Sequence, residues 1–369
     1  MKVLTVGGAM IDTIAIIENS AIERMSLLNA GTSFLLLEDG RKTEALDIST
    51  HCGGGGINTA ISFARLGFEC ATLVKLGDDG RADQIVARLV QENVSTAWVL
   101  RDGRAPTGSS VLVSSHDRNA GVFTFRGANT LLTTDDINAR AFAVDLVYIA
   151  NLSNEAARAF PVLVATARNA GARVAVNPGT RQLRAHGAAF RESLPHIDIL
   201  SLNRREAEDV LALLDAGADL GPPSQRDAPL DFPYHLDHSD LARTGLTRHG
   251  RTVSLRAFFR ALIAAGVKNV LLTDGKDGAF AAHADGLIYC PAVPTEVAGT
   301  AGAGDAFGST FAAYIAQSAQ APFALCAAAI NASSVLGHID TQTGLLRQAE
   351  LDARLSEAAL IPNVIGWPL

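Results

Sequence analysis

The residues best suited to chemistry lie near the C-terminus, in the stretch GTAGAGDAFGSTF that begins at Gly299. Gly302, Ala303 and Gly304 precede Asp305 and a run of small residues typical of a helix. Glycine lets a backbone approach an anion closely, and free amides at a helix N-terminus add donors and a positive dipole end. Asp305 is then placed to accept a proton from an attacking hydroxyl while the amides hold a transferring phosphoryl group. The alternative is an ordinary helix cap, because Asp is a good capping residue.

A second glycine-rich stretch, CGGGGINTAISFARLG, runs from Cys52 to Gly67. Gly53 and Gly54 offer open backbone, and the Asn58 amide supplies both a donor and an acceptor for the hydroxyls of a small polyol. A flexible turn before a helix is the plainer interpretation. A dinucleotide-binding turn is a third, but the G-x-G-x-x-G register is poor and no acidic residue follows at the usual distance.

Composition narrows the class of protein. The 369 residues are 48% hydrophobic and 19% charged, which suits one large α/β domain with a small appendage, or two modest domains. A net charge of −7 argues against a nucleic-acid partner. The four cysteines are scattered, as in proteins of a reducing compartment. No apolar run reaches the roughly 18 residues of a membrane span, so we expect no membrane partner and a cytoplasmic location.

Apolar runs rich in β-branched residues alternate with Ala- and Leu-rich stretches of helical periodicity, which predicts a mainly parallel sheet covered on both faces. The predicted strands are Val3–Val6, Ala71–Leu76, Leu146–Ile149, Val174–Val176, Ile197–Leu200 and Val270–Thr273. The predicted helices include Asn58–Leu66, Gln84–Glu92, Glu155–Ala170 and Leu255–Ala265.

Two segments interrupt this alternation. Residues 14–50 contain short strand-like runs separated by turn residues, and we expect them to form a small β lid on a large domain made of residues 1–13 and 51–369. Residues 216–252 include a proline-rich stretch, which predicts an irregular surface insertion within the large domain.

Taken together, the two glycine-rich stretches resemble the two signatures of the PfkB (ribokinase-like) family of carbohydrate and nucleoside kinases. The first signature is matched by Gly53, Gly54, Gly56 and Asn58, and the second by Gly302-Ala303-Gly304-Asp305. The resemblance implies a ribokinase-like three-layer α/β sandwich with a mainly parallel central sheet and a small β lid. It also implies an ATP-dependent kinase that transfers the γ-phosphoryl group to a hydroxyl of a sugar or sugar-like substrate. A nucleoside kinase, or a catalytically silent regulator that binds a sugar or nucleotide, is the alternative.

The same resemblance assigns roles to individual residues. Asp305 would be the catalytic base, with Gly302, Ala303 and Gly304 around the transferring group. Asp12, at the end of TVGGAMID, would hold substrate hydroxyls as a bidentate acceptor; the plainer interpretation is a carboxylate at a strand end. The complete expected substrate set is Asp12, Gly53, Gly54, Asn58, Arg126 and Asn129.

For the nucleotide, the resemblance implies ATP with Mg²⁺. Asn203 and Glu206 would organise the ion through water, in the family's N-x-x-E motif; the same spacing fits a helix capping box, and both roles are compatible. The expected ATP contacts are Asn177, Thr273, Gly275, Gly278, Gly304 and Asn331. For the last of these, a helix residue that faces solvent is the alternative.

One departure from the pattern concerns a second cation. The family's second signature usually begins with Asp, which helps to bind a monovalent cation, and this chain has Gly299 there. A monovalent cation is therefore doubtful as a cofactor. Apolar lid strands invite pairing with a second copy, so we expect a homodimer through the lid.

Overall fold

The structure is a computed structural model that describes residues 1–18, 23–26, 33–36, 40, 42–115, 120–214, 239–357 and 363–369. Among these residues, none of the helices has the length and apolar character that a bilayer crossing requires.

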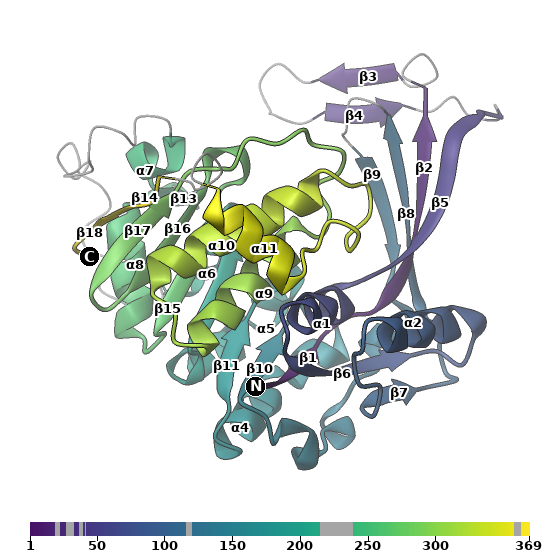
Figure 1. Ribbon diagram of the computed structural model, residues 1–369, viewed down its shortest axis with the longest axis horizontal. Helices are drawn as coiled ribbons and strands as arrows, with labels where there is room; N and C mark the ends of the chain where they lie inside the picture. Colours follow the sequence, from purple (N-terminus) through teal and green to yellow (C-terminus); the bar gives the residue numbers. More distant parts are fainter. Residues whose placement is uncertain are drawn as a thin grey trace.

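A large twisted sheet forms the centre of the molecule (Figure 1). Its parallel part consists of neighbouring strands whose carboxyl ends share one edge. An antiparallel extension follows β15. In spatial order the strands are β18 (Ile365–Trp367), β17 (Gly286–Cys290), β16 (Ala279–His283), β15 (Asn269–Thr273), β12 (Ile199–Asn203), β11 (Arg173–Val176), β10 (Leu146–Ile149), β1 (Lys2–Val6), β6 (Glu69–Leu76) and β7 (Val99–Arg101).

Helices cover both faces of this sheet, and each face has its own hydrophobic cluster. The first face carries α1 (Gly55–Arg65), α2 (Gly80–Gln91), α9 (Ala303–Ala316), α10 (Ala321–Leu336) and α11 (Gln348–Ser356). The second carries α3 (Glu155–Arg158), α4 (Phe160–Asn169), α5 (Thr180–Ser193), α6 (Arg204–Leu214), α7 (Asp240–Thr244) and α8 (Leu255–Ala264). Short 3₁₀ turns span Gly127–Thr130, Thr134–Asp136, Ala139–Phe142, Leu194–His196 and Gly275–Asp277.

A second, smaller sheet projects from the main body beside α1 and α2 (Figure 1). Its strands, in spatial order, are β5 (Ala45–Gly53), β2 (Met10–Ile17), β8 (Gly108–Ser115) and β9 (Ala120–Phe125). A separate hairpin of β3 (Glu23–Ser26) and β4 (Ser33–Leu36) lies at its far end, and another hairpin pairs β13 (Leu246–Arg248) with β14 (Arg251–Val253).

The fold class predicted from the sequence is confirmed: a three-layer α/β sandwich with a mainly parallel sheet and a small sheet. The small sheet is broader than the segment 14–50, because β8 and β9 come from residues 108–125 and because β2 and β5 extend to Met10 and Gly53. Those residues had been placed in the large domain. Long-range pairing of this kind leaves no signal in local periodicity.

The expected insertion at residues 216–252 needs correction. Residues 215–238 lie outside the described residues. From Ser239 onward the chain forms α7 and the β13–β14 hairpin, with Leu241 and Leu246 fully buried. This second part therefore belongs to the hydrophobic core of the large domain rather than to an irregular surface excursion.

Candidate active site

Polar residues collect where the parallel strands end. Asn203 closes β12 and is paired in register with Thr273 at the end of β15, while Asn177 follows β11 directly. Asn177 donates from Nδ2 to the Ser201 carbonyl at 2.9 Å, which ties it to the neighbouring strand. In open α/β sheets this edge is where ligands bind.

The first turns of α1 and α9 meet above that edge. Each helix begins at a glycine with a positive φ: 104° at Gly54 and 82° at Gly302, both in regions that L side chains rarely adopt. Asn58, in the first helix, donates from Nδ2 to Oδ2 of Asp305, in the second, at 2.8 Å. The two glycine-rich motifs, about 250 residues apart in the sequence, are therefore one structure in space.

The turn that begins α9 has the features of an anion site. The Ala306 amide is the first to close a helical hydrogen bond, to the Gly302 carbonyl, so the amides of Ala303, Gly304 and Asp305 have no intrahelical acceptor. A Cβ on Gly304 would meet no heavy atom within 4 Å outside its own helix. A phosphate oxygen could approach those amides without steric hindrance.

Asp305 lies at the edge of this turn, partly buried. Burial raises the pKa of its carboxyl group, the Asn58 hydrogen bond opposes that shift, and the charge of Asp12 adds to it. The Asn58 bond is therefore the described contact that favours the ionised form needed of a base.

Asp12 comes to the same place from the small sheet. Four neighbouring strands align His51, Asp12, Ser110 and Thr124 in one row across that sheet. The Ser110 hydroxyl donates to Asp12 Oδ1. Burial raises the pKa of Asp12, while Ser110 and His51 lower it. A Cβ on Gly53 would lie 1.9 Å from Asp12 Oδ2, so the carboxylate occupies space that only a glycine leaves.

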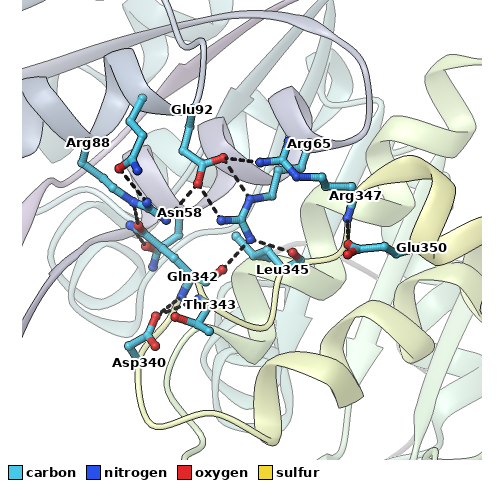
Figure 2. Close-up of polar contacts among 11 residues, drawn as sticks. Asn58, Arg65, Arg88, Glu92, Asp340, Gln342, Thr343, Leu345, Arg347 and Glu350 are labelled. Carbon is cyan, nitrogen blue, oxygen red and sulfur yellow. Dashed lines mark hydrogen bonds and ion pairs between the residues drawn. The ribbon is translucent and has the colours of Figure 1, made fainter.

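A loop that the sequence analysis did not single out completes the site. Thr341 lies against both Gly53 and Gly302, and its hydroxyl donates to Asn58 Oδ1 at 2.9 Å. Gln342 donates from Nε2 to the same oxygen at 3.1 Å. Figure 2 shows Gln342 between Asn58 and the side chains of α2. In the sequence, the only sign of Thr341 and Gln342 is a polar run, DTQT, after an apolar helix.

These contacts change the role expected of Asn58. Its side chain is 3% exposed, its acceptor oxygen is used by Thr341 and Gln342, and its amide faces Asp305. The side chain thus contacts protein groups on both sides and positions the Asp305 carboxylate, instead of presenting a donor and an acceptor to a ligand.

The side chain of Asn129, like that of Asn58, forms its hydrogen bonds with the protein itself. Its Oδ1 accepts from the Ala9 amide at 2.9 Å and its Nδ2 donates to the Ala9 carbonyl at 2.7 Å, which fixes the link between β1 and Asp12. Arg126, three residues earlier, is different: its Nε is buried and has no hydrogen-bond partner among the described residues. Burial lowers the pKa of Arg126, and the charge of Arg181 lowers it further.

On the nucleotide side, the predicted glycines differ in their surroundings. Gly275 has a φ of 58° and no atom within 4 Å of its Cβ position, so it leaves open space beside Thr273. Gly278, in contrast, lies against the Cys290 carbonyl, 2.4 Å from its Cβ position. Gly278 therefore serves the close packing of the β15–β16 hairpin against the next strand.

Asn331 does not reach a cleft. It is fully buried between α9 and the end of the polar loop, donating to Thr310 Oγ1 at 2.7 Å and accepting from the Leu346 amide at 2.9 Å. The contact with ATP that the PfkB resemblance implies for Asn331 does not fit this burial. The periodicity of a helical sequence does not tell whether a polar residue is packed against other protein groups or faces a ligand.

Asn203 and Glu206 form the reciprocal capping box that their spacing allowed. The Glu206 amide donates to Asn203 Oδ1 and Glu206 Oε2 accepts from the Asn203 amide, both at 2.9 Å. Glu206 Oε1 is not used in this cap. Oxygen donors of this kind fit Mg²⁺, which keeps most of its waters. The described residues contain no cluster of three or more His, Cys, Asp or Glu that could hold a metal directly.

Gly299 occupies a crowded position. A Cβ there would lie 2.8 Å from the His338 carbonyl oxygen and 3.1 Å from that of Ile339. This backbone arrangement leaves no room for the aspartate that the PfkB resemblance would place at Gly299.

Comparison with known proteins identifies the family. The sequence model of the family described as pfkB family carbohydrate kinase matches residues 2–220 and 246–348. The chain belongs to this family. The gap in the match, residues 221–245, falls in the segment expected to be an insertion. Membership makes the protein a phosphotransferase acting on an alcohol group, and implies ATP and Mg²⁺ as its cofactors.

Individual relatives of this pfkB kinase are distant. The chain is 24% identical over 328 residues to the deoxyribokinase of Salmonella typhimurium, covering 88% of this chain and 92% of the relative. It is 24% identical to the ribokinase of Staphylococcus aureus, covering 70% and 73%. The nucleoside kinase of Methanocaldococcus jannaschii has a similar structure, with a TM-score of 0.72 at 18% identity, covering 96% and 98%. The Thermotoga maritima ribokinase has a TM-score of 0.70 at 17% identity, covering 96% and 99%.

The buried Glu206 makes stability depend on pH. Burial raises its pKa to about 7, against about 4.3 in an unfolded chain, so the folded state binds a proton that the unfolded state releases. This contribution is complete below about pH 4.3 and is lost as the pH rises to 7. Unfolding free energies of the wild type and Glu206→Gln, measured with EDTA from pH 5 to 8, should diverge by up to about 3 kcal/mol, with the wild type falling relative to the variant until pH 7.

The matched control is Glu208→Gln on the same helix, whose side chain is 26% exposed. It removes a carboxylate of the same helix that is outside the capping box, so a pH-dependent difference found for Glu206→Gln alone assigns the effect to Glu206. Parallel curves for Glu206→Gln and the wild type would contradict the raised pKa.

Proposed function

We propose that the protein transfers the γ-phosphoryl group of ATP to a hydroxyl of a sugar or sugar-like acceptor, with Asp305 as the general base. The observation that carries this proposal is the position of Asp305 at the free amides of α9, joined by Asn58 to the glycine-rich turn that receives Asp12. A carboxylate to hold the acceptor, a carboxylate to take its proton and a cradle for phosphate thus share one small space.

Each residue of the proposed site would have a separate role in the reaction. Asp12 and the backbone of Gly53 and Gly54 bind acceptor hydroxyls, with Ser110 holding the Asp12 carboxylate. Asp305 takes the proton at its free carboxylate oxygen, Oδ1, because Oδ2 accepts from Asn58. Bound Mg²⁺·ATP supplies the phosphoryl group, and the amides of Gly304 and its neighbours stabilise negative charge there.

On the nucleotide side we propose Thr273, Gly275 and Asn177 as contacts at the strand ends. Asn203 and Glu206 would orient waters of the Mg²⁺ ion, since Glu206 Oε1 is not used in the capping box. With Gly299 in place of an aspartate, no carboxylate is available there for a monovalent cation, and we propose that turnover does not depend on one.

Asp305→Asn should lower kcat by about 10²–10⁴, because the amide keeps the shape of the side chain but cannot accept the proton. A coupled assay for ADP release measures this. The matched control is Asp285→Asn in the β16–β17 hairpin, where the side chain is 94% exposed. Turnover of Asp305→Asn within a few-fold of the control would remove Asp305 from the role of base.

A nucleoside acceptor on the same fold is the alternative, favoured by the structural similarity to the M. jannaschii nucleoside kinase. Arg126 is a further candidate for contact with the acceptor, whether sugar or nucleoside, since its buried Nε offers an unused donor near Asn129 and the Asp12 strand. We propose that it binds an oxygen of the acceptor.

Arg126→Met should therefore raise the KM for the acceptor about tenfold or more and leave the KM for ATP unchanged, because one charge-assisted hydrogen bond is lost. The control is Arg243→Met on α7, whose side chain is 57% exposed and pairs with Asp240. Both variants are assayed on a panel of pentoses, hexoses and nucleosides; the acceptor with the highest wild-type kcat/KM decides between sugar and nucleoside. An unchanged acceptor KM would exclude Arg126 from the acceptor site.

We also propose that the protein is a homodimer joined through the small sheet. The register of β5, β2, β8 and β9 puts the side chains of Ile48, Val111, Phe123 and Phe125 on the face opposite Asp12. Their exposed fractions are 65%, 44%, 67% and 52%, an unusual exposure for apolar side chains that share one face. The same face of a second copy is complementary to it by symmetry.

Phe123→Asp should convert a dimer to a monomer in light scattering at micromolar concentration, because a charge would be buried without a partner at the centre of the interface. Val122→Asp is the matched control, since Val122 is 56% exposed but lies on the other face of the small sheet, the face that carries Asp12. A wild-type protein that is monomeric under the same conditions would refute the proposed dimer.

A further inference from the structure

A chain of hydrogen bonds leads to Asp305, and every donor in it points toward Asp305. The first donor is Arg88. Arg88, on α2, donates from Nε to Gln342 Oε1 at 3.0 Å. Gln342 then donates to Asn58 Oδ1 at 3.1 Å, and Asn58 donates to Asp305 Oδ2 at 2.8 Å. Each side chain accepts from the one before it and donates to the next.

The direction matters because an amide side chain can be turned over at little cost. Asn and Gln each carry a donor and an acceptor of nearly the same shape, so their orientation is set only by their partners. Arginine has donors and no acceptor. Gln342 must therefore turn its oxygen to Arg88 and its amide to Asn58, and Asn58 must in turn present its own amide to Asp305.

Thr341 cannot set this orientation alone. Its hydroxyl donates to Asn58 Oδ1, but a hydroxyl accepts as readily as it donates, so it would also tolerate a reversed Asn58. Asp305 itself selects the Asn58 amide when it is ionised, because a carboxylate only accepts. Among the other described contacts of Asn58, Gln342 is the one that discriminates between the two orientations. A reversed Asn58 would place its carbonyl oxygen against the Asp305 carboxylate, acceptor against acceptor.

Arg88 itself is held by Glu92. The Glu92 carboxylate is 6% exposed and accepts from Arg88 at 2.9 Å and from Arg65 at 2.6 Å and 3.0 Å (Figure 2). The Arg65 hydrogen bonds lower the pKa of Glu92, burial opposes them, and nearby arginines add to the lowering. Glu92 thus stays ionised and keeps both guanidinium groups in place.

The loop that carries Gln342 is fixed from two sides. Arg65 donates from Nη1 to the carbonyls of Gln342 and Leu345, at 2.8 Å and 2.6 Å. Asp340 Oδ1 accepts from the amides of Gln342 and Thr343, both at 2.8 Å. The backbone of Gln342 therefore has a defined place before its side chain meets Asn58.

From this arrangement we propose that Gln342 is a positioning residue for the base: oriented by Arg88, it fixes the Asn58 amide so that Asp305 is kept ionised and aimed at the acceptor. The inference rests on the proposed function, in which Asp305 takes the proton.

The test is Gln342→Glu, which keeps the shape and the contact with Arg88 but replaces the donor facing Asn58 with an acceptor. The acid limb of the kcat–pH profile should move up by about one pH unit, and kcat at a pH well down that limb should fall about tenfold, because the carboxylate loses a hydrogen bond that favours its charged form. The KM for ATP should not change. A profile that superimposes on that of the wild type would overturn the proposal.

Two further variants separate orientation from charge and from folding. Gln342→Met removes the amide without adding charge, and should move the acid limb in the same direction by a smaller amount. Arg88→Met leaves the Gln342 amide free to reverse, and should also move the acid limb of the kcat–pH profile up. Arg88→Lys keeps a side chain that only donates, so its acid limb should match that of the wild type. Equal profiles for Arg88→Met and Arg88→Lys would show a purely structural role. If Gln342→Glu fails to fold, judged by circular dichroism, these variants decide.

Asp305→Asn serves as the reference in every assay. If Asp305→Asn is inactive and the Gln342 and Arg88 variants keep the wild-type profile, the orientation proposal fails and the base assignment stands. If Asp305→Asn keeps turnover within a few-fold of the wild type, the assignment of Asp305 as base fails, and the orientation proposal fails with it.

Discussion

The site depends on how closely the first turns of α1 and α9 approach each other. That approach depends on glycines that lie against neighbouring segments: Gly54 against the Gly8 carbonyl, Gly53 against Asp12 and Gly302 against Thr341, each within 3 Å of the position a Cβ would take. Side chains at these places would displace the segments that hold the two helix starts, and with them the 2.8 Å bond between Asn58 and Asp305. The glycines therefore help to fix the acceptor-binding and phosphate-binding halves of the proposed site relative to each other.

Burial at this meeting point has a second effect. It raises the pKa of Asp12, Asp305 and Glu206, so in one region burial disfavours the charged form of three carboxyl groups. Donors from neighbouring residues oppose this: the Ser110 hydroxyl for Asp12, the Asn58 side chain for Asp305 and the Asn203 backbone amide for Glu206. The charge state of the site thus depends on a few individual hydrogen bonds, and each of them comes from a different element of the fold.

Much of this organisation could be predicted from the sequence. Buried parallel strands have continuous apolar runs, so β1, β6, β10, β11, β12 and β15 were located to within a few residues, and the two glycine motifs identified the ends of α1 and α9. Local patterns did not show which segments meet. β8 and β9 were not assigned to the small sheet, Thr341 and Gln342 lay in an unremarkable polar run, and Asn331 gave no sign that its partners were Thr310 and the Leu346 amide. The chemistry of a single amide depends on partners hundreds of residues away.

The path of the chain from β5 into α1 has a mechanical consequence. The small sheet ends at Gly53 and the helix begins at Gly55, so Gly54 is one of the places where the chain crosses from the sheet that carries Asp12 to the body that carries Asp305. A swing of the small sheet would therefore turn the backbone at the proposed acceptor site itself. Asn58, one turn beyond this crossing, would stay with Asp305.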